Sequence, residues 1–123
     1  MIADTSIWID HFLGKTGEDL EVFRKSLNEG RVMMAPVVLT ELLSSQHLPE
    51  ALEKDLCEME FAEPRPQFWI DAGRLRRRLA RTGLNASLAD CLIAQSCLER
   101  DVPLLTRDNG IRSFGPKIGL SII

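Results

Sequence analysis

The sequence opens with MIADTSIWID, residues 1–10, a stretch in which an apolar run meets a carboxylate. Its first three residues predict the start of a buried strand, and Asp4 follows them directly, ahead of Thr5 and Ser6. Burying a carboxylate at the end of a strand is costly unless a cation or hydrogen-bond donors offset its charge. We therefore interpret Asp4 in two ways: as the N-cap of a helix over residues 5–13, or as part of a functional site.

Beyond this stretch, short apolar runs alternate with longer helical patterns. The apolar runs predict strands at residues 1–3, 32–35, 102–106 and 120–123, with a short extended piece at Phe61. Hydrophobic residues at helical spacing predict helices over residues 18–28, 37–45, 50–58 and 68–82, and a further helix that begins at Ser87. This alternation predicts an α/β fold with a mainly parallel sheet and helices on both faces. In such sheets, functional sites form outside the carboxyl ends of the strands.

The size and composition of the chain narrow its class. With 123 residues it has the length of one domain, and we predict a single domain over residues 1–123. We find neither the roughly 18 uninterrupted apolar residues of a membrane span nor a signal-peptide pattern. Three cysteines without metal-ligand spacing fit a reducing compartment, so we expect a cytoplasmic protein. The formal net charge of −3 argues against non-specific binding of nucleic acid by the chain as a whole.

Four acidic residues stand beside apolar segments: Asp4 in IADTS, Glu41 in APVVLTELL, Asp90 in LNASLADCLIA and Asp108 in LLTRDNG. Each one has a structural explanation when it is taken alone. Asp4 is a candidate N-cap, and Asp90 forms a capping-box pattern with Ser87. Asp108 is a candidate first residue of a turn, and Glu41 a candidate solvent-facing residue of a short helix.

The four acids acquire a different meaning as a set. Asp4 and Asp108 end predicted strands at the same edge of the sheet, and Glu41 and Asp90 lie near the start of helices that should pack against that edge. Carboxylates that converge repel one another, so such a cluster needs protons or a cation. Oxygen ligands without His or Cys suit Mg²⁺ or Mn²⁺, which lowers the pKa of a bound water and polarises a phosphoryl oxygen. The set therefore indicates cleavage of phosphodiester bonds.

Four motifs together resemble the PIN-domain family: DTSIWID, APVVLTELL, GLNASLADCLIA and LLTRD, in the family's order and at about its intervals. The chain is similar over nearly its whole length to a VapC-type toxin of a bacterial or archaeal toxin–antitoxin pair. The resemblance implies a three-layer α/β/α sandwich around a parallel sheet and a Mg²⁺- or Mn²⁺-dependent endoribonuclease. It also implies a homodimer and an inhibitory VapB-type antitoxin as partner.

The resemblance also implies roles for particular residues. By position, Asp4, Glu41, Asp90 and Asp108 match the catalytic, metal-binding acids. Ser6 and Thr106 match small hydroxyl residues beside them, which are expected to orient a carboxylate or a water.

One position departs from the family pattern. The family often has a further Asp two residues after the position of Asp108, followed by Phe, whereas this chain has Gly110 and Ile111 there. The departure leaves a first metal in place but puts a second, independently bound metal in doubt.

The most basic stretch is GRLRRRLARTG, residues 73–83. Its arginines at positions i, i+3, i+4 and i+7 fall on one face of the predicted helix, with the leucines on the face toward the core. We consider three interpretations: a solvated helix face, a surface that binds RNA phosphates, or a surface for an acidic partner such as the antitoxin. The arginines concerned are Arg74, Arg77, Arg78 and Arg81.

These observations predict a metal-dependent endoribonuclease that acts as the toxin of a type II toxin–antitoxin system, with a metal-activated water attacking RNA. Two other interpretations stay open. One is a PIN-type RNA-processing nuclease outside toxin–antitoxin systems, which the absence of an adjacent antitoxin gene would indicate. The other is a binding module without catalytic activity, which a cleavage assay with metal distinguishes from both nucleases.

Overall fold

A small parallel sheet lies at the centre of the molecule. The computed structural model describes residues 1–123, in which β1 (Ile2–Ala3) pairs in parallel with β2 (Leu104–Leu105). Single parallel bridges extend the sheet on both sides, joining Ile2 to Met33, Met34 to Phe61 and Leu104 to Ile122. Ala3 and Leu105 are register partners, so both strands end at the same edge of the sheet.

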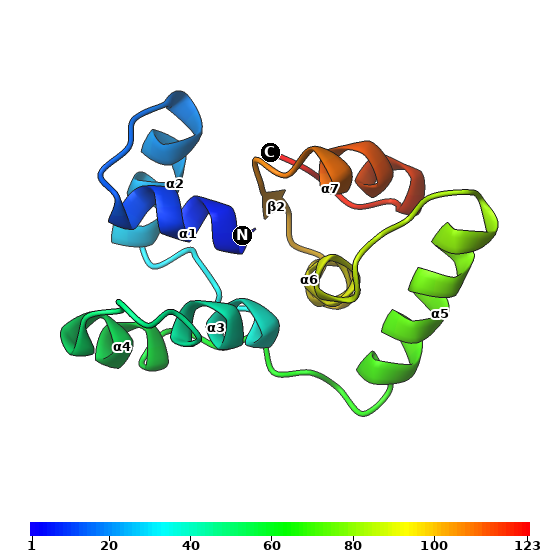
Figure 1. Ribbon diagram of the computed structural model, residues 1–123, viewed down its shortest axis with the longest axis horizontal. Helices are drawn as coiled ribbons and strands as arrows, with labels where there is room; N and C mark the ends of the chain where they lie inside the picture. Colours follow the sequence, from blue (N-terminus) through cyan, green and yellow to red (C-terminus); the bar gives the residue numbers. More distant parts are fainter.

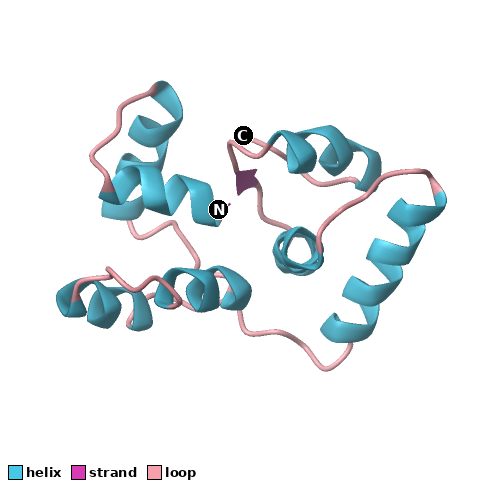
Figure 2. Ribbon diagram, viewed as in Figure 1, coloured by secondary structure: helices cyan, strands magenta, loops and turns pink.

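Helices make up most of the rest of the chain. Figure 1 shows α1 to α4 on one side of β2 and α5 to α7 on the other, with α6 between β2 and α5. Figure 2 shows how small the strand content is beside the helices. The helices are α1 (Thr5–Phe12), α2 (Glu18–Asn28), α3 (Pro36–Leu43), α4 (Glu50–Cys57), α5 (Phe68–Arg81), α6 (Leu88–Arg100) and α7 (Asn109–Phe114), followed by the 3₁₀ helix η1 (Gly115–Ile118).

The hydrophobic core surrounds the sheet and one central helix. Twenty-five buried residues form a single cluster that includes all four residues of β1 and β2. Within α6, Cys91, Ile93, Ala94 and Cys97 are all buried, so this helix is covered on most of its surface. A helix that is apolar nearly all round belongs inside a domain, and α6 packs against both α3 and α5. The first turn of α6 is therefore held firmly near the edge of the sheet.

The predicted α/β fold with a parallel sheet is confirmed, but the sheet is smaller than predicted. The prediction of strands at residues 32–35 and 120–123 is wrong in extent, because these segments make only single bridges. The strand predicted at residues 102–106 shrinks to the two residues of β2. An apolar run in the sequence indicates that the segment is buried. The length of the strand depends instead on how far the neighbouring segments pair with it. None of the helices combines the length and the apolar composition that a membrane crossing requires.

The helices agree more closely with the prediction. The helix over residues 18–28 has the predicted bounds, and Ser87 caps α6 as its sequence pattern indicates. The segment after Asp108 differs: a turn was expected there, but Asp108 caps α7. The DNG pattern suits a turn and a helix start equally well, because an Asp side chain accepts a hydrogen bond from the backbone in both.

Candidate active site

Asp4 stands where β1 ends and α1 begins. Its carboxylate caps α1, with Oδ1 accepting hydrogen bonds from the Ile7 N–H at 3.2 Å and from the Ser6 hydroxyl at 2.6 Å. The Thr106 hydroxyl donates to Oδ2. Only 3% of the residue is exposed, so three donors and the positive end of the α1 dipole offset the cost of burial. Asp4 is therefore the N-cap of α1, and it also lines the pocket described below.

The register of the sheet brings Thr106 to Asp4 across 102 residues of chain. The Asp4 N–H donates to the Leu105 carbonyl at 3.0 Å, which aligns the residues that follow the two strands. The Thr106 hydroxyl then links two acids, because it accepts from the Asp108 N–H at 2.9 Å while it donates to Asp4. Ser6 and Thr106 thus both orient a carboxylate, as expected for the small hydroxyl residues.

The other three acids reach the same edge from three helices. Glu41 lies on α3, and its Oε1 accepts from the Thr5 hydroxyl at 2.8 Å. Asp90 lies in the first turn of α6. Asp108 caps α7, with Oδ1 accepting from the Ile111 N–H at 2.8 Å.

All four predicted acids line one pocket of about 560 Å³. They come from four different elements that the fold brings to the carboxyl ends of β1 and β2, which is where parallel sheets place their sites. The remaining lining residues are Thr5, Ser6, Ile93, Arg107, Asn109 and Gly110. We call this the acidic pocket.

The acids of the pocket affect one another electrostatically. Burial raises the pKa of Asp90 above its ordinary value, a hydrogen bond with Ser87 opposes this, and the charges of Asp108, Asp4 and Glu41 raise the pKa further. Repulsion from all three partners means that the four carboxylates share one electrostatic environment. A cation in the acidic pocket would relieve this repulsion.

The donor set of the acidic pocket fits a hydrated hard cation. Its acids offer only oxygen ligands, the type that Mg²⁺ and Mn²⁺ prefer. No three acidic, His or Cys side chains converge closely enough to hold a metal by direct contact alone. Mg²⁺ keeps several of its waters and uses one or two carboxylates, so four acids around a roomy pocket suit it.

Gly110 contributes no side chain to the acidic pocket. A Cβ at this position would lie 3.0 Å from Asp108 Oδ1, so any side chain there would crowd that carboxylate. Because residue 110 is glycine, no side chain crowds the Asp108 carboxylate, and the acidic pocket has no further acid at this position. This is the structural consequence of Gly110 standing where the family often has Asp.

Besides Gly110, four lining residues were not predicted as site residues, namely Thr5, Ile93, Arg107 and Asn109. Two of them, Thr5 and Arg107, bind acidic side chains. Thr5 binds Glu41, and its place directly after Asp4 in DTS was the available signal. Arg107 stands between Thr106 and Asp108 in LLTRD, and its guanidinium binds Asp19 at 2.5 and 2.6 Å and Asp10 at 2.7 Å. These contacts tie the segment after β2 to α1 and α2.

The Arg107 network predicts a pH effect on stability. Hydrogen bonds from Arg107 lower the pKa of Asp19, and those from Lys15 and then Arg107 lower the pKa of Asp10, below the ordinary value of 3.8. A carboxylate with a depressed pKa stabilises the fold at pH above that ordinary value and loses this contribution as the pH falls through its folded-state pKa. Thermal stability should therefore fall less steeply with acidification in Arg107→Ala than in the wild type.

Melting temperatures between about pH 6 and pH 2 test this effect. The matched control is Arg31→Ala, because Arg31 pairs only with Glu29 at an exposed position. The prediction would be contradicted if the melting temperatures of the wild type and Arg107→Ala fell equally steeply as the pH is lowered.

Comparisons with known proteins agree with this architecture. The PIN domain model matches residues 1–115. The chain is similar in structure to VapBC from Salmonella typhimurium in its DNA-bound crystal structure, with 25% identity, a TM-score of 0.69, and 99% of this chain and 95% of that chain covered. It is also similar to VapBC2 from Rickettsia felis bound to a promoter DNA fragment, with 17% identity, a TM-score of 0.71, and 99% and 96% covered.

A third similar structure is FitAcB from Neisseria gonorrhoeae, with 17% identity, a TM-score of 0.71, and 99% and 95% of the two chains covered. Among curated proteins, none matches the sequence significantly. The family match spans nearly all of the chain, including the elements that carry the four acids of the pocket. The chain belongs to the PIN-domain family.

Proposed function

We propose that this protein is a Mg²⁺- or Mn²⁺-dependent endoribonuclease and the toxin of a type II toxin–antitoxin system. The observation that carries the proposal is the acidic pocket, where Asp4, Glu41, Asp90 and Asp108 meet at the carboxyl ends of the two strands. The match to the PIN domain and the similarity to VapBC structures support it at the level of the family.

The residues of the acidic pocket have distinct positioning roles in this proposal. Asp4 is held rigidly by three donors, so its carboxylate is preorganised as a ligand. Thr5 orients Glu41 in the same way from the facing helix. Asp90 and Asp108 complete the set of oxygen donors. In this proposal Asp4, Glu41, Asp90 and Asp108 would together hold the hydrated cation, one or two of them directly and the others through its waters.

When bound, the cation would lower the pKa of a coordinated water and polarise an oxygen of the phosphate whose phosphorus the water attacks. The carboxylates of the acidic pocket would orient the attacking water, and one of them would accept its proton. Preorganisation matters here, because a displaced ligand misaligns the attack. Asp4, buried and held by three donors, is the most firmly held of the four acids.

The proposed partners are RNA as substrate, a VapB-type antitoxin as inhibitor and a second copy of the chain in a homodimer. The similar structures from Salmonella typhimurium and Rickettsia felis are described as VapBC bound to DNA, which supports the antitoxin. We propose action in the cytoplasm, where RNA is available. An adjacent small gene whose product copurifies with this chain and inhibits it would distinguish a toxin from an RNA-processing nuclease.

Metal-dependent cleavage of RNA by the purified protein tests the proposed activity. Cleavage of single-stranded RNA should require Mg²⁺ or Mn²⁺, stop when a chelator is added and resume when metal is restored. Asp90→Asn, purified in parallel, reports any contaminating ribonuclease. Cleavage that persists in the chelator, or no cleavage with either metal, would contradict the proposal, and the second result would favour a binding module.

A further inference from the structure

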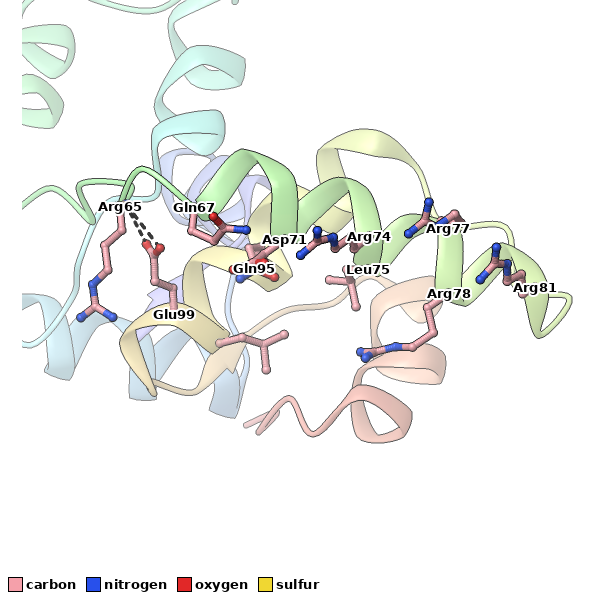
Figure 3. A pocket seen from close by; sticks show the side chains of 11 residues that line it. Arg65, Gln67, Asp71, Arg74, Leu75, Arg77, Arg78, Arg81, Gln95 and Glu99 are labelled. Carbon is pink, nitrogen blue, oxygen red and sulfur yellow. Dashed lines mark hydrogen bonds between the residues drawn. The ribbon is translucent and has the colours of Figure 1, made fainter.

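The arginines of α5 form a continuous basic surface. We call Arg74, Arg77, Arg78 and Arg81 the arginine stripe. They line one side of a hollow of about 770 Å³ between α5 and α6, and Figure 3 shows them spaced along α5, with Arg65 beyond its start. Leu75 and Leu79 of the same helix are buried and anchor it to the core. Seven residues of helix cover about 10 Å, so the stripe presents an extended row of charge.

The guanidinium groups of the arginine stripe have no partners in the protein. None of the four takes part in an ion pair, and none of their side chains forms a hydrogen bond. The hollow contains five arginines and only two acids, Asp71 and Glu99, and Glu99 accepts from the Arg65 backbone N–H at 3.3 Å. This surface is strongly positive in a chain whose formal net charge is −3.

A buried polar side chain also lines the hollow. Gln95 of α6 is only 9% exposed, yet it lines the hollow opposite the arginine stripe, and its amide forms no hydrogen bond within the protein. Figure 3 shows Gln95 beside Asp71, between α6 and α5. Trp8 Nε1 and Arg100 Nε are the buried side-chain atoms without a partner, so the Gln95 amide reaches the solvent of the hollow and can hydrogen-bond to water or to a polar ligand there.

A second hollow adjoins the first one at Arg77. Arg77 also lines an adjoining hollow of about 790 Å³ that reaches Ala86, Ser87 and Leu88. Arg76 donates to the Ala86 carbonyl at 3.2 Å and so holds this segment against α5. Ser87 caps the helix whose first turn carries Asp90, so this second hollow lies at the same end of α6 as the acidic pocket, although the two have no lining residue in common.

We infer that the arginine stripe binds the phosphate backbone of single-stranded RNA and guides it over the start of α6 to the acidic pocket. This inference rests on the proposed function. Four carboxylates around the site of cleavage repel the phosphates of a substrate, so the affinity for RNA has to come from elsewhere on the surface. Guanidinium groups bind phosphates through paired hydrogen bonds, independently of base sequence. The second hollow, which Arg77 also lines, lies at the same end of α6 as Asp90, and this location favours the substrate over an acidic protein segment.

Binding of RNA without cleavage tests this inference separately from the enzyme activity. The probe is a short fluorescein-labelled single-stranded RNA, titrated in a chelator and followed by fluorescence anisotropy at several salt concentrations. The variant is Arg77→Ala with Arg81→Ala. The matched control is Lys25→Ala with Lys54→Ala, which removes two exposed charges from α2 and α4, on the other side of the molecule (Figure 1).

The arginine variant should bind RNA roughly tenfold or more weakly than the wild type, because two charge-assisted contacts are lost. Its plot of log K against log[salt] should also flatten by about 1.4, at roughly 0.7 for each phosphate contact on a single strand. The lysine control should keep the wild-type affinity and slope. Melting temperatures within a few degrees of the wild type are expected, since these side chains have no partners in the protein.

Three results would overturn the inference. Unchanged RNA binding by the arginine variant would mean that the arginine stripe is only a solvated helix face. Equal losses of RNA affinity in the arginine variant and the lysine control would mean that RNA responds only to the overall charge. Normal RNA binding together with weaker inhibition by the antitoxin would assign the arginine stripe to an acidic protein partner. If the stripe proves necessary for RNA binding while the wild type cleaves no RNA with either metal, the inference holds and only the proposed catalytic function fails.

Discussion

Replacement of Asp4 by Asn should lower RNA cleavage at least about a hundredfold and leave the protein folded. Loss of a metal ligand removes an interaction worth several kcal/mol in the transition state, and each 1.36 kcal/mol corresponds to a factor of about ten in rate. Asn is as good an N-cap as Asp, so the Ile7 N–H and the Ser6 hydroxyl keep an acceptor. Only the contact with Thr106 changes, because the amide NH₂ cannot accept its proton.

The expected change in stability is correspondingly small. Disturbing the hydrogen bond with Thr106 costs about 1 kcal/mol, while removing one negative charge relieves repulsion on Asp90. Asp4→Ala, which removes the cap as well, should lose about 1–2 kcal/mol more of unfolding free energy than Asp4→Asn. Single-turnover cleavage and thermal melting of both variants separate the charge from the cap.

Asp90→Asn should lose cleavage in the same way as Asp4→Asn. Its matched control is Asp101→Asn at the end of the same helix, where the left-handed backbone at φ 51° suits Asn. Full activity of both single variants would leave Asp4 as a cap only and Asp90 as a residue of the first turn of α6. A large fall in melting temperature without any dependence on metal would lead to the same conclusion.

Divalent metal should raise the free energy of unfolding, by about 2.7 kcal/mol when Mn²⁺ is a hundredfold above its Kd. The proposed cation site forms only when the fold brings α1, α3, α6 and α7 to one edge of the sheet, so binding of a cation there would be linked to folding. Chemical denaturation with Mn²⁺ and with a chelator measures the difference. Identical unfolding curves under both conditions would contradict a folded-state metal site.

Asp108 variants should reduce this stabilisation. Because Asp108 also caps α7, Asp108→Ala combines the loss of a ligand with the loss of a cap, whereas Asp108→Asn keeps the cap and isolates the ligand. Calorimetry with Mn²⁺ should give about one site per chain, since Gly110 supplies no further carboxylate. Two tight sites per chain would refute the importance of Gly110.

The acidic pocket was predicted from local pattern because the topology of a parallel sheet leaves little freedom. Asp4 and Asp108 follow short apolar runs, and strands that run in parallel end at one edge. The helix that begins at Ser87 places Asp90 in its first turn by capping alone. The sheet itself was over-predicted, because an apolar run reports burial and not the length of pairing.

The sequence by itself determined the features that depend on near neighbours: the caps at Asp4 and Ser87, the bounds of α2, and the single face of α5 that carries the arginine stripe. Spacing along the chain sets these features, since helices have a fixed period. Only the tertiary structure decided which distant groups meet. Thr106 reaches Asp4 across the sheet, Arg107 joins Asp10 to Asp19, and the arginine stripe stays without partners. Such contacts depend on the packing of whole elements, and no local pattern encodes the register of β1 against β2 that aligns Thr106 with Asp4.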